Sequence, residues 1–132
     1  MVMQKPDAVQ LAGIRFQIGV AEEALSAQPN DTDILRYLAH AYTLVERAEE
    51  GLLADQRLVK LMPTDARVHY NLACSYALTG KKDEALETLQ EARDLGFEDL
   101  ELLRNDEDLE ILRTDPRFKE LERRLAEGRE ED

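Results

Sequence analysis

The sequence predicts an all-α protein, and three observations indicate this. Residues that favour helices, such as Ala, Leu, Glu and Arg, dominate a chain of 132 residues in which only 5% are aromatic. Gly and Pro, which interrupt helices, number only 6 and 4. Hydrophobic residues make up 43%, enough for a folded core, and they recur mostly every three or four positions. A single helical domain is the expectation for this length.

The pattern also repeats along the chain. When the sequence is shifted by 34 residues, residues 32–65 fall on residues 66–99 without a gap, and nine of the 34 positions are identical. Ordinary composition would give about two or three identities. A fixed period of this length is typical of stacked helical repeats. The identical pairs are Leu38/Leu72, Ala39/Ala73, Tyr42/Tyr76, Leu44/Leu78, Glu50/Glu84, Leu52/Leu86, Gln56/Gln90, Leu61/Leu95 and Asp65/Asp99.

Each repeat is predicted to be a pair of helices. Pro63 closes the first pair, since proline cannot continue a helix. Gly80 and Gly96 follow the two helices of the second pair and allow the left-handed turn that ends a helix. Small residues such as Gly51 and Ala85 allow the neighbouring helices to approach closely. The four predicted helices cover residues 32–45, 48–62, 66–79 and 83–95.

Further helices are predicted on both sides of the repeats. Residues 8–28 form one helix pattern, and Pro29 follows it 34 residues before Pro63. Near the C-terminus, Asp115 is placed to cap a last helix in which Pro116 takes the first position. The apolar face of the N-terminal helix consists of Leu11, Ile14, Ile18, Ala21 and Leu25, and the predicted C-terminal helices cover residues 98–104, 107–113 and 116–127.

These residues resemble the tetratricopeptide repeat, a family of helix pairs with the same period. His69 and Asp55 depart from the family pattern, because each stands where relatives have a large or aromatic residue. The matching positions are Leu38, Ala39, Tyr42, Gly51, Leu58 and Pro63 in the first repeat, and Asn71, Leu72, Ala73, Tyr76, Gly80, Ala85, Leu89 and Ala92 in the second.

The resemblance covers residues 8–127 and implies a right-handed α-solenoid of about seven helices, in which each repeat buries its apolar stripe against its neighbour. Residues 1–132 are then one domain. Its expected parts are a partial repeat over 8–28, repeats over 32–65 and 66–99, a helical cap over 100–127 and a frayed acidic tail over 128–132.

The resemblance also implies a binding surface. In this family the first helix of each repeat lines a concave groove that holds peptides of partner proteins. Arg can hold a carboxylate through two hydrogen bonds, Asn can satisfy a peptide backbone, and Tyr offers rigid area with a polar tip. An ordinary solvated face is the alternative interpretation. The residues that the resemblance places on the groove are Asp33, Arg36, Tyr37, His40, Arg67, Tyr70, Asn71 and Cys74.

The expected function is therefore that of a non-catalytic adaptor that binds a peptide or helix of a partner protein. The alternative is a scaffold that associates with itself, through the long N-terminal helix or through the groove. No phosphate-binding glycine loop or hydrolase motif is present in the sequence, so no enzymatic activity and no cofactor are expected.

Charge and cysteine content exclude several other classes. The net charge of −12 disfavours nucleic acid and anionic membranes as partners. One cysteine, Cys74, excludes an intramolecular disulfide and any zinc site with several thiolates. His40 and Cys74 take equivalent places in the two repeats, but no third ligand aligns with them, so no metal is expected. The absence of a signal-like or membrane-spanning apolar run favours a cytoplasmic location.

Overall fold

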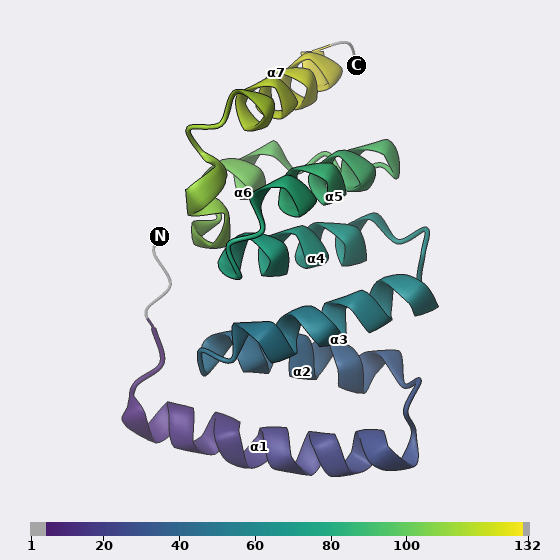
Figure 1. The fold of residues 1–132 in the computed structure, drawn as a ribbon, viewed down its shortest axis with the longest axis vertical. Helices are drawn as coiled ribbons and strands as arrows, with labels where there is room; N and C mark the ends of the chain where they lie inside the picture. The colour runs from purple at the N-terminus through teal and green to yellow at the C-terminus, as the bar shows by residue number, and fades with distance from the viewer. Residues whose placement is uncertain (1–4, 131–132) are drawn as a thin grey trace. The chain divides into compact units, whose positions relative to one another are not determined.

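The computed structural model describes residues 5–130, and all regular secondary structure in this part of the chain is helical (Figure 1). It holds seven α-helices and one short 3₁₀ helix, η1, and no strand, so the prediction of an all-α protein is confirmed. None of the described helices combines the length and apolar character needed to cross a membrane. The elements are α1 (Ala8–Ala27), α2 (Thr32–Leu44), α3 (Ala48–Leu61), α4 (Ala66–Leu78), α5 (Lys82–Asp94), α6 (Leu100–Asn105), η1 (Glu107–Leu112) and α7 (Pro116–Glu130).

The helix pairs recur at the predicted offset. The first helices of the two pairs, α2 and α4, begin at Thr32 and Ala66, and the second helices, α3 and α5, begin at Ala48 and Lys82, so both intervals equal the sequence period. The local cause is a repeated cap. Asp31 accepts hydrogen bonds from the backbone N–H groups of Asp33 and Ile34, both at 3.0 Å, and Asp65 caps the start of α4 in the same way. Such a cap satisfies backbone donors that have no partner within the helix.

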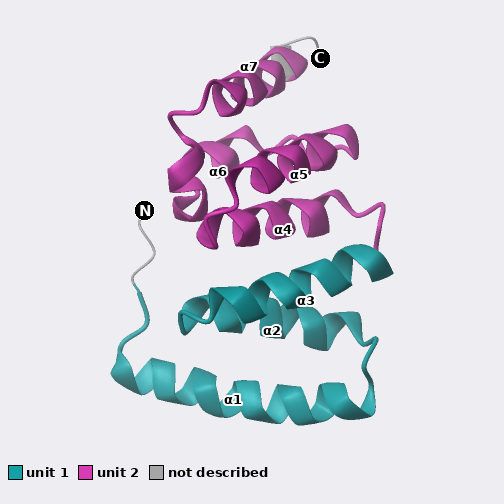
Figure 2. Cartoon of the chain, viewed as in Figure 1, with its two compact units in different colours: residues 1–61 teal, residues 62–132 magenta. Residues whose placement is uncertain are grey.

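The chain divides into two compact units, Met1–Leu61 and Met62–Asp132, where the sequence predicts one domain (Figure 2). In unit 1, α1 packs on α2, and α2 packs on α3. Gly51 of α3 lies so close to α2 that a Cβ atom there would be 3.2 Å from the carbonyl oxygen of Ala39, which confirms the predicted close approach. The apolar face predicted for α1 is also confirmed: Ile18 is buried with Leu38, Ala41, Tyr42 and Val45, and Leu11, Ile14, Ala21 and Leu25 pack against this cluster.

Unit 2 holds α4, α5, α6, η1 and α7 around one apolar core. Asp115 caps α7 as predicted, since its side chain accepts from the backbone N–H of Arg117 at 2.8 Å. The short helix predicted over 107–113 is present as the 3₁₀ helix η1, which covers residues 107–112. One expectation for this region is corrected: α7 continues to Glu130, where a frayed tail was expected from residue 128. Residues 131–132 of that tail lie outside the described residues. The fully buried side chains of the C-terminal segment are Leu103, Leu109, Leu112 and Phe118.

Candidate functional site

Unit 1 presents four of the predicted groove residues on one face of α2. Their spacing of three and four residues aligns them along the helix. All four side chains are exposed, and the Tyr37 hydroxyl donates a hydrogen bond to the Gln17 side chain of α1 at 2.8 Å. This face therefore presents an acid, a guanidinium, a phenol and an imidazole to solvent. The four residues, called the α2 face below, are Asp33, Arg36, Tyr37 and His40.

The predicted groove residues of α4 divide into two groups. Arg67 and Asn71 are exposed, as a binding surface requires. Tyr70 and Cys74 are only 2% and 7% exposed, so the expectation that they face an open groove is corrected. The physical reason is the C-terminal segment. The ring of Phe97 stacks on the ring of Tyr70 at a centroid distance of 4.4 Å, and η1 packs against α4.

The buried residues of α4 meet a carboxylate from the segment that covers them. The Tyr70 hydroxyl donates to Oδ2 of Asp106 at 2.6 Å, and the Cys74 thiol donates to the same oxygen at 3.7 Å. Arg113 donates to the backbone carbonyl of Asp106 at 2.6 Å. These bonds join α4 to the start of η1, because Asp106 also caps η1 through the N–H of Asp108.

Burial changes the acidity of this cluster. It raises the pKa of the Tyr70 hydroxyl and the pKa of the Cys74 thiol, and the charge of Asp106 adds to both shifts. Burial also raises the pKa of the Asp108 carboxyl to about 6, with a further contribution from Asp106 and Glu107. A protonated thiol is a poor nucleophile and a poor metal ligand. Tyr70 and Cys74 therefore keep their protons at neutral pH and act as hydrogen-bond donors to Asp106.

Sequence reasoning missed this cluster as a possible ligand set. Cys74, Asp106 and Asp108 can each bring one ligand atom to within 4.8 Å of the others. In the repeat pattern His40 is the position equivalent to Cys74, so the sequence suggests His40, and not residues 106–108, as a second ligand beside Cys74. The Asp-x-Asp spacing of residues 106–108 was the available signal, but only the fold shows that it lies beside α4. Because Tyr70 and Cys74 already donate to Asp106, the geometry favours a structural role.

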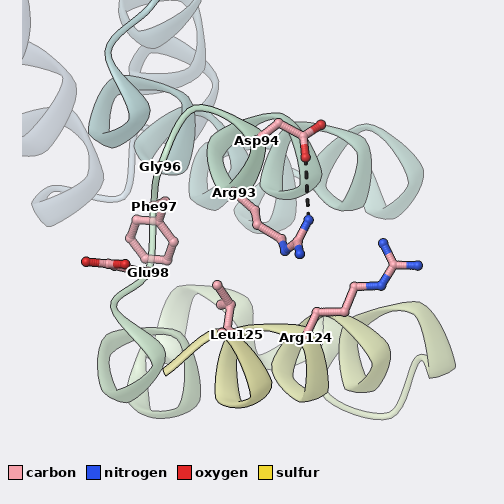
Figure 3. A pocket seen from close by; sticks show the side chains of 8 residues that line it. Arg93, Asp94, Gly96, Phe97, Glu98, Arg124 and Leu125 are labelled. Carbon is pink, nitrogen blue, oxygen red and sulfur yellow. Dashed lines mark ion pairs between the residues drawn. The ribbon is translucent and has the colours of Figure 1, made fainter. Parts of the chain in front are cut away.

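A concave surface lies between α5 and α7 of unit 2. A pocket of about 380 Å³ opens where α5 ends and the C-terminal half of α7 passes it. Figure 3 shows Arg93 of α5 and Leu125 and Arg124 of α7 pointing toward one another across this space, with the Phe97 ring at its side. A neighbouring pocket of about 440 Å³ shares Arg124. Its wall includes the apolar side chains of Leu86, Pro116 and Leu121.

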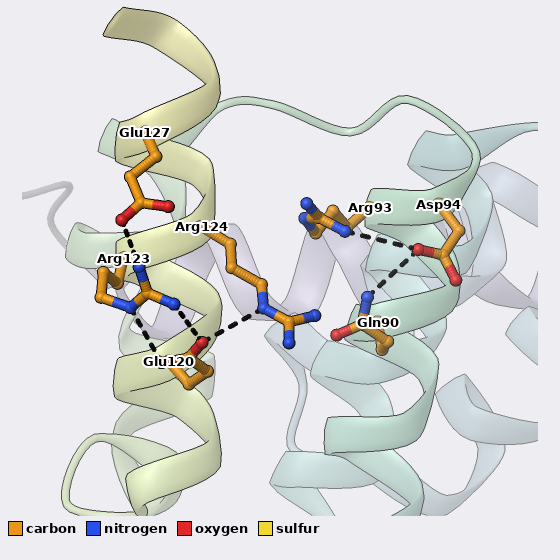
Figure 4. Close-up of polar contacts among 7 residues, drawn as sticks. All are labelled: Gln90, Arg93, Asp94, Glu120, Arg123, Arg124 and Glu127. Carbon is orange, nitrogen blue, oxygen red and sulfur yellow. Dashed lines mark hydrogen bonds and ion pairs between the residues drawn. The ribbon is translucent and has the colours of Figure 1, made fainter. Parts of the chain in front are cut away.

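The two pockets together are called the α5–α7 cleft below. The ion pairs in Figure 4 lie along its two sides, within α5 and within α7. On α7, Glu120 accepts from Arg123 and from Arg124, and these two cations lower the pKa of Glu120 to about 2. On α5, Asp94 accepts from the side chain of Gln90 at 3.1 Å and pairs with Arg93 at 3.6 Å. The cleft thus combines apolar surface with the guanidinium groups of Arg93, Arg117 and Arg124, each of which pairs with an acidic side chain. The sequence pattern did not indicate it, because these residues lie on the second helix of the repeat and on the cap.

The comparison with family models identifies the class of protein. The model described as the N-terminal domain of A/B hydrolase-like proteins matches residues 33–132, which are 100 of the 132 residues. The chain therefore belongs to this family of A/B hydrolase-like N-terminal domains. Helix α1 precedes the matched region. No curated protein gives a significant sequence match to the chain.

Proposed function

We propose that this chain is a non-catalytic protein-interaction domain that binds a peptide or helix of a partner protein. The observation that carries the proposal is the α2 face, where four polar side chains of different chemistry stand exposed in one row. Arg67 and Asn71 take exposed places on α4, the corresponding first helix of the next pair. A tetratricopeptide-type solenoid of right-handed twist is part of this proposal, and the equal intervals between helix starts support it.

The chemistry of the α2 face favours a peptide that carries a carboxylate. Arg36 can hold a carboxylate in a two-point contact, and Tyr37 provides flat apolar area beside it. The same composition, in a chain of net charge −12, disfavours phosphate backbones as ligands. The α5–α7 cleft provides a second surface of similar chemistry through Arg93 and Arg124.

The reactive groups of the chain favour binding over catalysis. Cys74 is buried, and its raised pKa keeps the thiol protonated. The family description refers to proteins that resemble A/B hydrolases. We infer that the binding partner is a catalytic domain of that type, or a protein that such a domain acts on, and that this chain supplies recognition in the cytoplasm.

A selection experiment tests the proposal. Peptides selected from a random display library on the purified chain are titrated by calorimetry against wild type and variants. Arg36→Glu should weaken binding of the selected peptides at least tenfold, because it replaces the cation with an anion. Arg15→Glu, the same exchange at an exposed position of α1, is the control and should leave the affinity unchanged.

Two outcomes decide between the surfaces. If Arg124→Glu weakens binding and Arg36→Glu does not, the α5–α7 cleft is the binding site and the α2 face is not. If the library yields no peptide that the chain binds, or if neither variant changes the affinity, the proposed function is wrong. Circular dichroism shows that each variant keeps its helix content.

A further inference from the structure

Helix α1 exposes a row of large apolar side chains. Val9, Phe16 and Val20 are 82%, 74% and 56% exposed. Together with Gly13 they follow a spacing of 4, 3 and 4 residues, which places them on one face of a helix. This α1 row points away from α2, because Ile18 and the other core-facing residues of α1 lie on the opposite side. Figure 2 shows α1 along the edge of unit 1, with α2 beside it.

The row lies in a part of the chain that carries little net charge. Residues 5–28 hold two cations, Lys5 and Arg15, and three anions, Asp7, Glu22 and Glu23, for a net charge of −1. The whole chain carries −12. Two copies can therefore approach through α1 with little of the repulsion that the rest of the surface would cause. Exposed apolar rows of this kind mark interaction surfaces in folded proteins.

We propose that the α1 row binds the same row of a second copy, with the two helices antiparallel. The row is symmetric about its centre: residues 9 and 20 lie equally far from the centre in opposite directions, and so do residues 13 and 16. In that register Val9 packs on Val20 of the second copy, and Phe16 packs on Gly13. A Cβ atom at Gly13 would meet no atom within 4 Å, so the helix surface is open there to receive a ring. Both copies then use an identical surface, as a twofold interface requires.

The fit of the row favours the antiparallel register over the parallel one. A parallel arrangement would place ring on ring at Phe16 and leave an empty space between the two Gly13 residues. It would also bring the exposed Glu23 side chains of the two copies to the same level along the helices. The filled Gly13 positions and the separation of these like charges therefore select the antiparallel pair.

The size of the contact predicts a reversible dimer. One helix of 20 residues from each copy is about 30 Å long, and a contact of this kind lies at the small end of specific interfaces, below about 1,200 Å². Monomer and dimer should therefore exchange with concentration. This inference does not rest on the proposed function, since the α2 face and the α1 row share no residue, and either can fail without the other.

Analytical ultracentrifugation of the full chain over a thousandfold concentration range tests the dimer. The wild type should shift from the mass of one chain toward twice that mass as its concentration rises. Phe16→Glu and Gly13→Glu should both stay monomeric, each shifting the dissociation constant at least tenfold. Gly19→Glu is the matched control. Gly19 lies on the same helix, about 90° around the axis from the centre of the row, and a Cβ atom there would meet no atom within 4 Å. This variant should dimerise like the wild type.

Crosslinking tests the register. In the antiparallel pair Val9→Cys and Val20→Cys should form a disulfide when the two variants are mixed, whereas neither alone should do so above the wild-type background set by buried Cys74. Three results would overturn the inference. The first is a wild type that keeps the mass of one chain at every concentration, which is also the result expected if another protein or segment covers the row. The second is a dimer that Phe16→Glu does not weaken, and the third is a disulfide between two copies of the Val9→Cys variant.

Discussion

Glu46 and Gly80 occupy the same position in consecutive helix pairs, and both have a left-handed backbone, with φ of 62° and 80°. The position follows the first helix of each pair, where the chain must reverse within a few residues to start the second helix. Glycine adopts this conformation without a Cβ clash, whereas glutamate in the same conformation costs about 1 kcal/mol or more. The first helix pair therefore carries backbone strain that the second pair avoids.

Replacing Glu46 with glycine should stabilise the protein. We expect Glu46→Gly to raise the free energy of unfolding by about 1 kcal/mol, and Gly80→Ala to lower it by a similar amount. Urea denaturation followed by circular dichroism measures both. Gly19→Ala, a glycine-to-alanine change in an exposed helix position, is the control and should stabilise by about 0.5–1 kcal/mol. Destabilisation by Glu46→Gly would show that this turn is not strained.

The contact between Tyr70 and Asp106 should contribute strongly to the stability of unit 2. Asp106→Ala leaves a buried hydroxyl without its acceptor, so we expect a loss of about 1–3 kcal/mol in the free energy of unfolding. Tyr70→Phe combined with Asp106→Ala should cost less than the sum of the two single changes, because both partners are then removed. Glu107→Ala, an exposed neighbour, should change stability by less than about 0.5 kcal/mol. If the losses of unfolding free energy from Tyr70→Phe and Asp106→Ala simply add in the double variant, the two side chains do not interact.

Protonation of Asp108 should make stability depend on pH in acid. Its folded pKa of about 6 lies above the value of about 3.9 in an unfolded chain, because burial disfavours the charged form. The folded state therefore binds this proton more tightly, and the stabilisation is complete below about pH 4 and lost as pH rises through 6. Since Asp108 is only partly buried, we expect a change of about 1 kcal/mol after screening.

Comparison with Asp108→Asn isolates this effect from the other carboxylates. The difference in unfolding free energy between the variant and the wild type should grow in favour of the variant between pH 4 and 7. Urea denaturation at a series of pH values measures it, and the carboxyl ¹³C shift of Asp108 gives the pKa directly. A parallel pH dependence of the two proteins would contradict a raised pKa at this position.

Cys74 should react slowly with thiol reagents. The side chain is 7% exposed, and burial together with Asp106 raises its pKa, so both access and thiolate content are low. We expect alkylation by iodoacetamide at pH 8 to be at least a hundredfold slower than that of the urea-unfolded chain. Mass spectrometry over time measures both rates. Rapid alkylation of the folded protein would mean that η1 does not keep α4 covered.

The amino-acid sequence by itself determined the helices and their order. Apolar spacing, the glycines at 80 and 96 and the aspartate at 115 act over a few residues, so their consequences are readable without a fold. The same holds for the core-facing side of α1, because the period of a helix assigns each residue to a side. The α2 face was expected from the resemblance to the tetratricopeptide repeat, and its four side chains are exposed.

Only the tertiary structure decided which of these sides remain open. Tyr70 and Cys74 share a helix face with residues that stay exposed, yet Phe97 and the segment from Asp106 cover them. The α5–α7 cleft likewise depends on where α7 lies against α5. The physical reason is that burial arises from contacts between segments distant in sequence, as Tyr70 with Phe97 and Asp106, and helical periodicity carries no information about such contacts.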